Sequence, residues 1–255
     1  MKRGGVGLSI YALAAYVFLH LPLLILAAFS FNQSRFTVWE GFSLRWYAAA
    51  LKDAQLLEAS WNSLVIAVVA TVVSTAIGTL CAYGLWKKTS RFLSGTLYLS
   101  LVTPEIVTGI SLLAFYEWLF RYLRVQLGMH TVILAHVSFS IAFVVIVVMA
   151  RLGTMDGQLE EAALDLGANE WQAFRFVTLP VILPAVIAAA LLAFTVSFDD
   201  YVITSLVAGV DSETLPMAIY AIARRGVNPV VNAISALIVF GFGSLILISE
   251  RLRAR

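Results

Sequence analysis

Three carboxylates lie within long apolar stretches of the sequence: Glu105 near the middle of one stretch, and the adjacent Asp199 and Asp200 in the later part of another. An ionisable side chain inside a membrane is costly and marks a candidate functional site by default. Because no Lys or Arg lies deep in these stretches, a path lined by the three acids favours a cationic ligand, whose ammonium groups the carboxylates would bind. The alternative for Glu105 is that it is protonated or hydrogen-bonds to a neighbouring helix.

Glu105 directly follows Pro104, which predicts a kink in the helix that carries it. Proline removes a backbone hydrogen bond, and Gly109 is expected to add slack one turn later. Broken helices near the middle of the membrane are where transporters place binding or gating groups. Glu117 and His136 lie near the ends of their apolar stretches and are weaker candidates.

The composition of the 255-residue chain is that of a membrane protein. Hydrophobic residues make up 61% and charged residues 13%, whereas a soluble domain carries roughly 25% charged residues. The net charge of +2 argues against a nucleic-acid-binding surface. The single cysteine, Cys81, excludes an internal disulfide, and no paired Cys/His spacing indicates a metal site.

Six apolar stretches approach or exceed the roughly 20 residues that a helix needs to cross a bilayer. The first is too long for a signal-peptide core, so we expect a retained helix. Basic residues cluster at the two termini and at the second and fourth connections, which predicts that both termini are cytoplasmic. The expected fold class is an all-α integral membrane protein, with one transmembrane domain over residues 1–255. Its six helices are expected at about 7–30, 61–86, 93–120, 132–151, 182–208 and 231–250.

Two long segments, 31–60 and 209–230, are then expected on the outer side. The first contains a short amphipathic helix with Ser43 as its N-cap, which we expect to lie flat at the outer surface. Its apolar face consists of Leu44, Tyr47, Ala48 and Leu51.

The connection at 155–181, between the fourth and fifth expected spans, is patterned as two short helices. Apolar residues of the first recur at i, i+3, i+4 and i+7, and Gly167 lies where a helix ends in a left-handed residue. Asn169 and Gln172 form a capping box for the second helix, which Pro180 is expected to end. The first helix presents Leu159, Ala162, Ala163 and Leu166, and the second carries Trp171, Phe174 and Val177.

Acidic residues accompany this apolar face, and a small helical hairpin of this kind is suited to a groove on a partner protein. The alternative is a hairpin that merely links two spans. We expect one exposed acidic surface formed by Glu160, Glu161, Asp165 and Glu170.

The same loop resembles the EAA loop of ABC importer permeases. Glu161-Ala162-Ala163, then Gly167, then Val177-Thr178-Leu179-Pro180 follow the pattern E-A-A-x3-G-x9-I-x-L-P, with Val for Ile. The resemblance implies the type I ABC importer permease fold in a bacterial inner membrane. It also implies a coupling loop, 155–181, that docks into an ATPase subunit through Glu161 and Gly167. The coupling-loop residues are Glu160, Glu161, Ala162, Ala163, Asp165, Gly167, Leu179 and Pro180.

The sequence has no G-x-x-x-x-G-K-[ST] phosphate-binding loop, so we expect no ATPase site and no cofactor in this chain. The resemblance implies that ATP and Mg²⁺ belong to a partner ABC ATPase dimer. It further implies a homologous second permease subunit, a periplasmic substrate-binding protein and membrane lipid as partners. The alternative function is an ATP-independent secondary transporter, with which six spans and buried acids are also compatible.

Further segments resemble the second permease subunit of spermidine/putrescine importers, along the whole chain. They include S-F-D-D-Y-V-I at 197–203, G-V-N-P at 226–229 and R-W-Y at 45–47. This resemblance implies polyamine transport, and Tyr201 would add a cation–π face. Alternatives are the other solutes of related permeases: aminobutyrate, opines, phosphonates and ferric iron. The implied substrate path comprises Trp46, Glu105, Phe198, Asp199, Asp200 and Tyr201.

Overall fold

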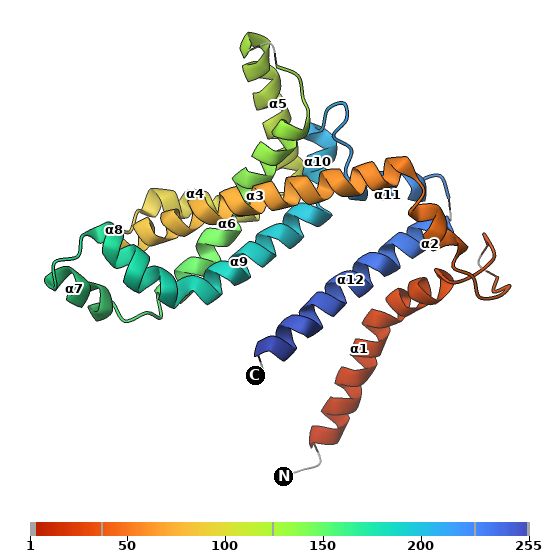
Figure 1. Cartoon of the computed structure of the whole chain (residues 1–255), viewed down its shortest axis with the longest axis horizontal. Helices are drawn as coiled ribbons and strands as arrows, with labels where there is room; N and C mark the ends of the chain where they lie inside the picture. Colours follow the sequence, from red (N-terminus) through yellow and green to blue (C-terminus); the bar gives the residue numbers. More distant parts are fainter. Residues whose placement is uncertain (1–3, 37, 124, 227, 254–255) are drawn as a thin grey trace. The chain divides into compact units, whose positions relative to one another are not determined.

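The computed structural model describes residues 4–36, 38–123, 125–226 and 228–253. Within these ranges the chain is helical, as expected, and its extended pairing is limited to one isolated antiparallel bridge between Asn32 and Phe42. The chain forms two compact units (Figure 1). The terminal unit comprises Met1–Leu57 and Ala218–Arg255, and the central unit comprises Glu58–Met217.

The terminal unit contains α1 (Gly4–Phe29), α2 (Arg45–Ala50) and α12 (Pro229–Arg253), and shares α11 (Leu215–Ala223) with the central unit. Within it, α12 packs against both α1 and α2. The segment between α1 and α2 is held by Asn32, whose side-chain amide donates to the carbonyl of Val38 at 2.7 Å. The backbone carbonyl of Asn32 accepts the indole N–H of Trp46 at 2.8 Å.

One side of α2 is buried in the chain and the other is exposed. Trp46 and Ala50 are buried, whereas Leu44 and Leu51 are exposed. The indole hydrogen bond to Asn32 turns Trp46 inward and so sets the rotation of a helix of only six residues. Ser43 is not the N-cap, which is Leu44. The prediction of Ser43 as the N-cap was therefore wrong.

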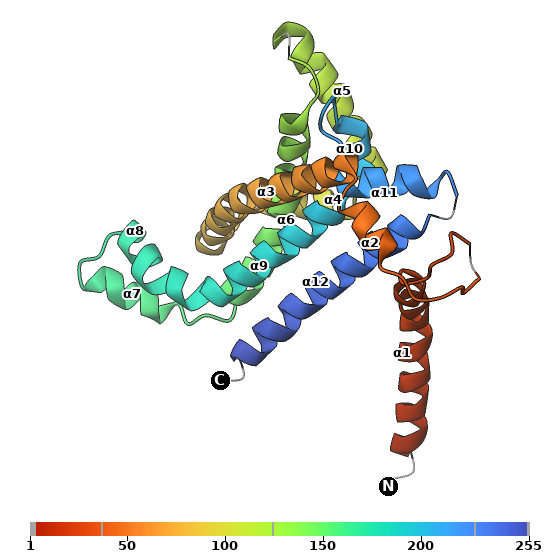
Figure 2. The same cartoon turned by 45° about the vertical axis from the view of Figure 1, so that its right-hand side comes forward.

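The central unit is a helical bundle. Its helices are α3 (Ala54–Lys87), α4 (Arg91–Val102), α5 (Glu105–Leu123), α6 (Met129–Leu152), α7 (Gln158–Asp165), α8 (Glu170–Ala173), the π-helical turn η1 (Phe174–Thr178), α9 (Leu179–Asp199) and α10 (Val202–Val207). One apolar cluster joins α6 to α3 and α9, and a second joins α6 to α5 and α10. In both views α9 runs beside α6, and α10 lies beside α5 (Figures 1 and 2). Both clusters contain buried residues of α6 and of α3, which contributes Ile66 to the second cluster, so these two helices form the centre of this unit.

Two glycines permit close helix packing in the central unit. A Cβ at Gly78 of α3 would lie 2.7 Å from the Cβ of Val144 on α6. A Cβ at Gly109 of α5 would lie 2.6 Å from the side chain of Leu206 on α10. Gly109, which was expected to add slack after Pro104, therefore brings α10 against α5.

The expected third and fifth spans are broken helices. At Thr103–Pro104 the axes of α4 and α5 are bent by 111°, and Thr103 is extended with ψ 128° because the residue before a proline avoids the helical conformation. The expected span at 182–208 is divided between α9 and α10 by Asp200, which is also extended with ψ 127°. The kink predicted at Pro104 is confirmed, whereas continuous helices over 93–120 and 182–208 are not observed.

Among the described residues, four helices are long and apolar enough to cross a membrane, or five if the bent pair α4 and α5 counts as one span. In α1 the apolar side chains are exposed along its length, as on a helix that faces lipid. The sixth expected span, 231–250, falls in α12, where the side chains of 242 and 245–250 lie outside the described residues. The terminal basic residues used to predict the topology, Lys2, Arg3, Arg251, Arg253 and Arg255, also have side chains outside the described part.

Candidate functional site

The loop at 155–181 folds as the two short helices that its sequence predicts. α7 ends before Gly167, which has the left-handed φ of 92° that favours glycine. Asn169 then caps α8: its side chain accepts from the N–H of Gln172 at 2.9 Å, and the Gln172 side chain accepts from the N–H of Asn169 at 2.9 Å. The helix, the left-handed residue and the capping box are all confirmed.

Pro180 does not end the second helix. The chain runs from α8 through η1 into α9 as one apolar helical segment, Glu170–Asp199. In η1 the N–H of Leu179 donates to the carbonyl of Phe174, five residues earlier. A π-turn of this kind re-routes the backbone hydrogen bonds at the point where Pro180 supplies no N–H, so the helix continues past the proline.

Glu160 is not part of an exposed acidic surface. Only 1% of Glu160 is exposed, because α7 turns this side chain toward the end of α3. There it forms an ion pair with Lys87 and accepts the hydroxyl of Tyr83 at 2.6 Å, while the hydroxyl of Thr178 in η1 donates to its other oxygen at 2.8 Å. Burial raises the pKa of Glu160, but these three hydrogen bonds and the charge of Lys87 outweigh it and hold the pKa below the ordinary value of 4.5.

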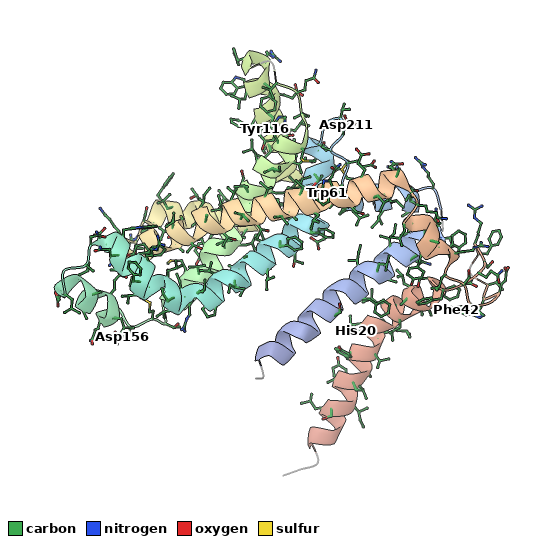
Figure 3. All side chains as sticks on the ribbon, viewed as in Figure 1. His20, Phe42, Trp61, Tyr116, Asp156 and Asp211 are labelled. Carbon is green, nitrogen blue, oxygen red and sulfur yellow. The ribbon has the colours of Figure 1, made fainter. Side chains whose placement is uncertain are left out.

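The opposite side of α7 is open to solvent. Glu161, Asp165 and Glu170 are exposed, as expected, and Leu166 at the tip of the hairpin is 89% exposed. Asp156, which precedes α7, and Asp211, which follows α10, mark opposite ends of the central unit (Figure 3). The hairpin therefore presents apolar and acidic side chains together at one end of this unit.

A pocket of about 360 Å³ lies where the two broken helices face each other. The break between α4 and α5 contributes Thr103 and Glu105, and the break between α9 and α10 contributes Asp199 and Tyr201. Both Glu105 and Asp199 are exposed. The remaining lining residues are Ser100, Leu101, Thr108, Phe139, Phe143, Val196, Asp200, Val202 and Ile203.

Asp200 differs from its neighbour, because its side chain is only 6% exposed and is held within the chain. Its carboxylate accepts the backbone N–H of Thr204 at 2.8 Å and the Thr204 hydroxyl at 2.7 Å. On α6, His136 places Nε2 3.5 Å from this carboxylate and 2.9 Å from the Thr204 hydroxyl, and its Nδ1 is 2.7 Å from the hydroxyl of Ser197. Asp200 therefore caps α10, and His136 joins the two halves of the broken helix.

Among the described residues, no group of three or more His, Cys, Asp or Glu side chains is arranged to hold a metal ion. The acidic pocket instead offers carboxylate oxygens, which suit a ligand that carries ammonium groups.

The sequence profile of the family described as "binding-protein-dependent transport system inner membrane component" matches residues 74–254. The chain belongs to this family. Membership makes it a multi-pass protein of the inner membrane, in agreement with its long apolar helices.

Relatives of this inner membrane component align over nearly the whole chain. It is 39% identical to the spermidine/putrescine transport system permease protein PotC of Escherichia coli (strain K12), with 100% of this chain and 94% of PotC covered. It is 40% identical to the putrescine transport system permease protein PotI of the same strain, with 95% and 89% covered. The resemblance to polyamine permeases that the sequence suggested is thereby confirmed.

Solved ABC transporters share the fold. A chain of the bacterial transporter involved in the import of the acidic polysaccharide alginate superposes with a TM-score of 0.71 at 15% identity, over 100% of this chain and 98% of that chain. A chain of the MetNI methionine transporter superposes with a TM-score of 0.65 at 20% identity, over 78% and 95%. The binding-protein-dependent component thus has the permease fold of ABC importers.

The structure brings together four of the six residues that were assigned to the substrate path of this inner membrane component. Phe198 stacks on Phe194 of α9, with ring centroids 5.7 Å apart, and Trp46 is buried in the terminal unit with the guanidinium of Arg45 4.1 Å from its ring. The four residues that line the pocket are Glu105, Asp199, Asp200 and Tyr201.

Sequence reasoning missed the partners of both buried carboxylates. His136 was considered only as a weak isolated candidate, and Tyr83, Lys87 and Thr178 were not considered as partners of Glu160. A local signal existed for Asp200, because aspartate is one of the residues preferred at the N-cap of a helix. The contacts of Glu160 join residues 77 and 18 positions away in the chain, and no local pattern indicates them.

Proposed function

We propose that this chain is a permease subunit of an ATP-driven importer that moves polyamines, spermidine or putrescine, from the periplasm to the cytoplasm. The observation that carries the proposal is the pocket between the two broken helices, where Glu105 and Asp199 supply negative charge and Tyr201 supplies an aromatic side chain. Carboxylates offset the dehydration of an ammonium group through charge and hydrogen bonding. The names of PotC and PotI support the same substrate class.

In this proposal the chain is one permease domain, 1–255, with six membrane-spanning segments and both termini in the cytoplasm. The bent pair α4 and α5 serves as the third segment, α9 with α10 as the fifth, and α12 as the sixth. The coupling loop is then cytoplasmic, and the segments at 31–60 and 209–230 are periplasmic.

The proposed partners follow from the family. An ABC ATPase dimer binds ATP and Mg²⁺ and docks on the coupling loop, a homologous second permease subunit completes the path, and a periplasmic binding protein delivers the substrate. Exposure of Glu161, Gly167 and Leu166 supports a docking role for the tip of the hairpin. This chain itself would bind no nucleotide and no cofactor.

The two adjacent aspartates have different proposed roles. Asp199 is exposed in the pocket and would contact the substrate, together with Glu105. Asp200 would act indirectly, because its oxygens already accept from Thr204 and face His136. Its contribution would be to hold the break that presents Asp199 to the pocket.

Uptake by proteoliposomes tests this proposal. The complete transporter is supplied with ATP, binding protein and labelled spermidine or putrescine, with aminobutyrate as competitor. We expect ATP-dependent polyamine uptake that Asp199→Asn reduces by raising KM, without loss of assembly. If a complex that hydrolyses ATP moves no polyamine, the substrate assignment is wrong. The same uptake assay is then applied to aminobutyrate, opines, phosphonates and ferric iron. Uptake without the ATPase subunit would identify a secondary transporter instead.

A further inference from the structure

Glu160 joins three elements of the central unit at one carboxylate. It belongs to α7, whereas Lys87 and Tyr83 belong to the last turns of α3, and Thr178 belongs to η1 at the start of α9. Both carboxylate oxygens are used: Oε1 faces Lys87 and Tyr83, and Oε2 accepts from Thr178. The contacts with Lys87 and Tyr83 tie α7 to α3, and the contact with Thr178 ties α7 to η1.

Aromatic side chains surround this buried carboxylate. The ring of Tyr83 lies 4.6 Å from that of Phe174, and Phe174 lies 5.4 Å from Trp171 of α8. The ammonium group of Lys87 lies 5.5 Å from the ring of Trp86. A charge that is 1% exposed is costly to leave without a partner, so the loop and the helix ends are stabilised in the one arrangement that supplies all three donors.

The position of this cluster relates the loop to the pocket. η1 continues directly into α9, and α9 ends at Asp199, which lines the pocket. A displacement of α7 that is passed to Thr178 is therefore applied to the helix that carries the proposed substrate ligand. A hairpin attached only by its two chain ends could move without displacing α9.

We infer that Glu160 is a positioning residue that locks the coupling loop to the ends of α3 and α9, so that a movement imposed on the loop is passed to the pocket. Tyr83, Lys87 and Thr178 are its partners in this lock. The inference deepens the proposed function and rests on it, since it assigns the exposed neighbour Glu161 to docking and the buried Glu160 to transmission.

Amide hydrogen exchange in the complete transporter tests the lock directly. Glu160→Gln and Lys87→Met should each raise the exchange of α7 and η1 together, by about tenfold to a hundredfold, as expected for the loss of a charge-assisted interaction. Lys88→Met is the matched control, because it removes the adjacent lysine and should leave exchange unchanged. Equal exchange in the Lys87 and Lys88 variants would overturn the lock.

Non-additivity separates an ionic lock from simple packing. Lys87→Met leaves a buried carboxylate without its cation, whereas the double variant Lys87→Met/Glu160→Gln removes both charges. We therefore expect the double variant to exchange more slowly than Lys87→Met alone. If the double variant shows the fastest amide exchange of the three variants, the carboxylate acts by packing and the inference is wrong.

The ratio of ATP hydrolysed to polyamine imported tests transmission. Glu160→Gln should raise this ratio several-fold while ATP hydrolysis persists, and Glu161→Gln should instead weaken hydrolysis by impairing docking. An unchanged ratio in Glu160→Gln, with loop exchange raised, would overturn transmission. If the unaltered complex moves no polyamine, the proposed function fails, and the exchange measurements still decide whether the lock exists.

Discussion

Replacement of Asp200 by alanine and by asparagine distinguishes a capping role from a ligand role. The carboxylate of Asp200 accepts the N–H of Thr204 at 2.8 Å, the Thr204 hydroxyl at 2.7 Å and the N–H of Ile203 at 3.4 Å. Thr204, Ile203 and His136 are all buried. Alanine would leave the two N–H groups without a side-chain acceptor and the Thr204 hydroxyl with only the backbone carbonyl of residue 200, at 3.3 Å. Asparagine retains one side-chain oxygen and is as good an N-cap as aspartate.

The expected loss of stability follows from the hydrogen-bond donors that lose their acceptor. A buried polar group without a partner costs about 1–3 kcal/mol, and loss of an N-cap costs about 0.5–2 kcal/mol. Since the two terms overlap at Thr204, we expect Asp200→Ala to reduce the free energy of unfolding by about 2–4 kcal/mol, and Asp200→Asn by no more than about 1 kcal/mol. Asp199→Ala should change it by less than about 0.5 kcal/mol, because that side chain is exposed.

The assay is thermal unfolding of the purified complex in detergent, followed by size-exclusion chromatography of the folded fraction, with uptake kinetics measured in parallel. Asp200→Ala should lower the midpoint of thermal unfolding and the maximal rate of uptake. Asp199→Ala should raise the KM of uptake and leave the unfolding midpoint unchanged. If asparagine at 200 is as damaging as alanine, Asp200 does not act as the cap of α10. If Asp199→Ala loses as much stability as Asp200→Ala, the two aspartates do not differ in role as described.

Two further predictions concern other parts of the central unit. Gly209→Ala would place a Cβ 1.8 Å from the carbonyl oxygen of Leu127, so it should destabilise the unit by at least about 3 kcal/mol. Gly84→Ala is the control: a Cβ at Gly84 meets open space, so this substitution should be neutral or stabilising in the same thermal-unfolding assay. Because the pKa of Glu160 is lowered by its partners, the stability it contributes is present above the ordinary value of 4.5 and is lost as the pH falls through the lowered pKa. Limited proteolysis of the coupling loop at a series of pH values measures this loss. Lys87→Met should move the loss to higher pH. If the Lys87→Met variant and the unaltered chain show the same pH dependence, Lys87 does not lower the pKa of Glu160.

Local patterns predicted the elements of the coupling loop well. The spacing of apolar residues in α7, the left-handed Gly167 and the Asn169 capping box each depend on neighbours within a few positions, so the sequence contains the whole signal. Pro104 acted in the same way, because proline restricts the residue directly before it. The break at Asp200 lacked such a breaker, and the apolar run concealed it.

Long-range pairing explains most of what the sequence did not predict. The sequence predicted Glu160 as an exposed acid because it lies among three other acidic residues. Its burial depends instead on Lys87 and Tyr83, which lie on another helix. His136 likewise finds Ser197 more than sixty positions later. In α2, the hydrogen bond from the indole of Trp46 to the backbone of Asn32, fourteen positions earlier, is another contact that no local pattern indicates.

The π-turn η1 has a further consequence for the direction in which α9 faces. An α-helix rotates by roughly 100° for each residue, whereas a wide π-turn accommodates one extra residue without changing the direction in which the following helix faces. A single-residue deletion within Phe174–Thr178 would therefore convert the turn into ordinary α-helix and leave the face of α9 nearly unchanged. A deletion within α9 itself, between the turn and Asp199, would instead rotate Asp199 by roughly 100° and carry it away from Glu105. We therefore expect the chain to tolerate the loss of one residue in the π-turn far better than the loss of one residue in α9.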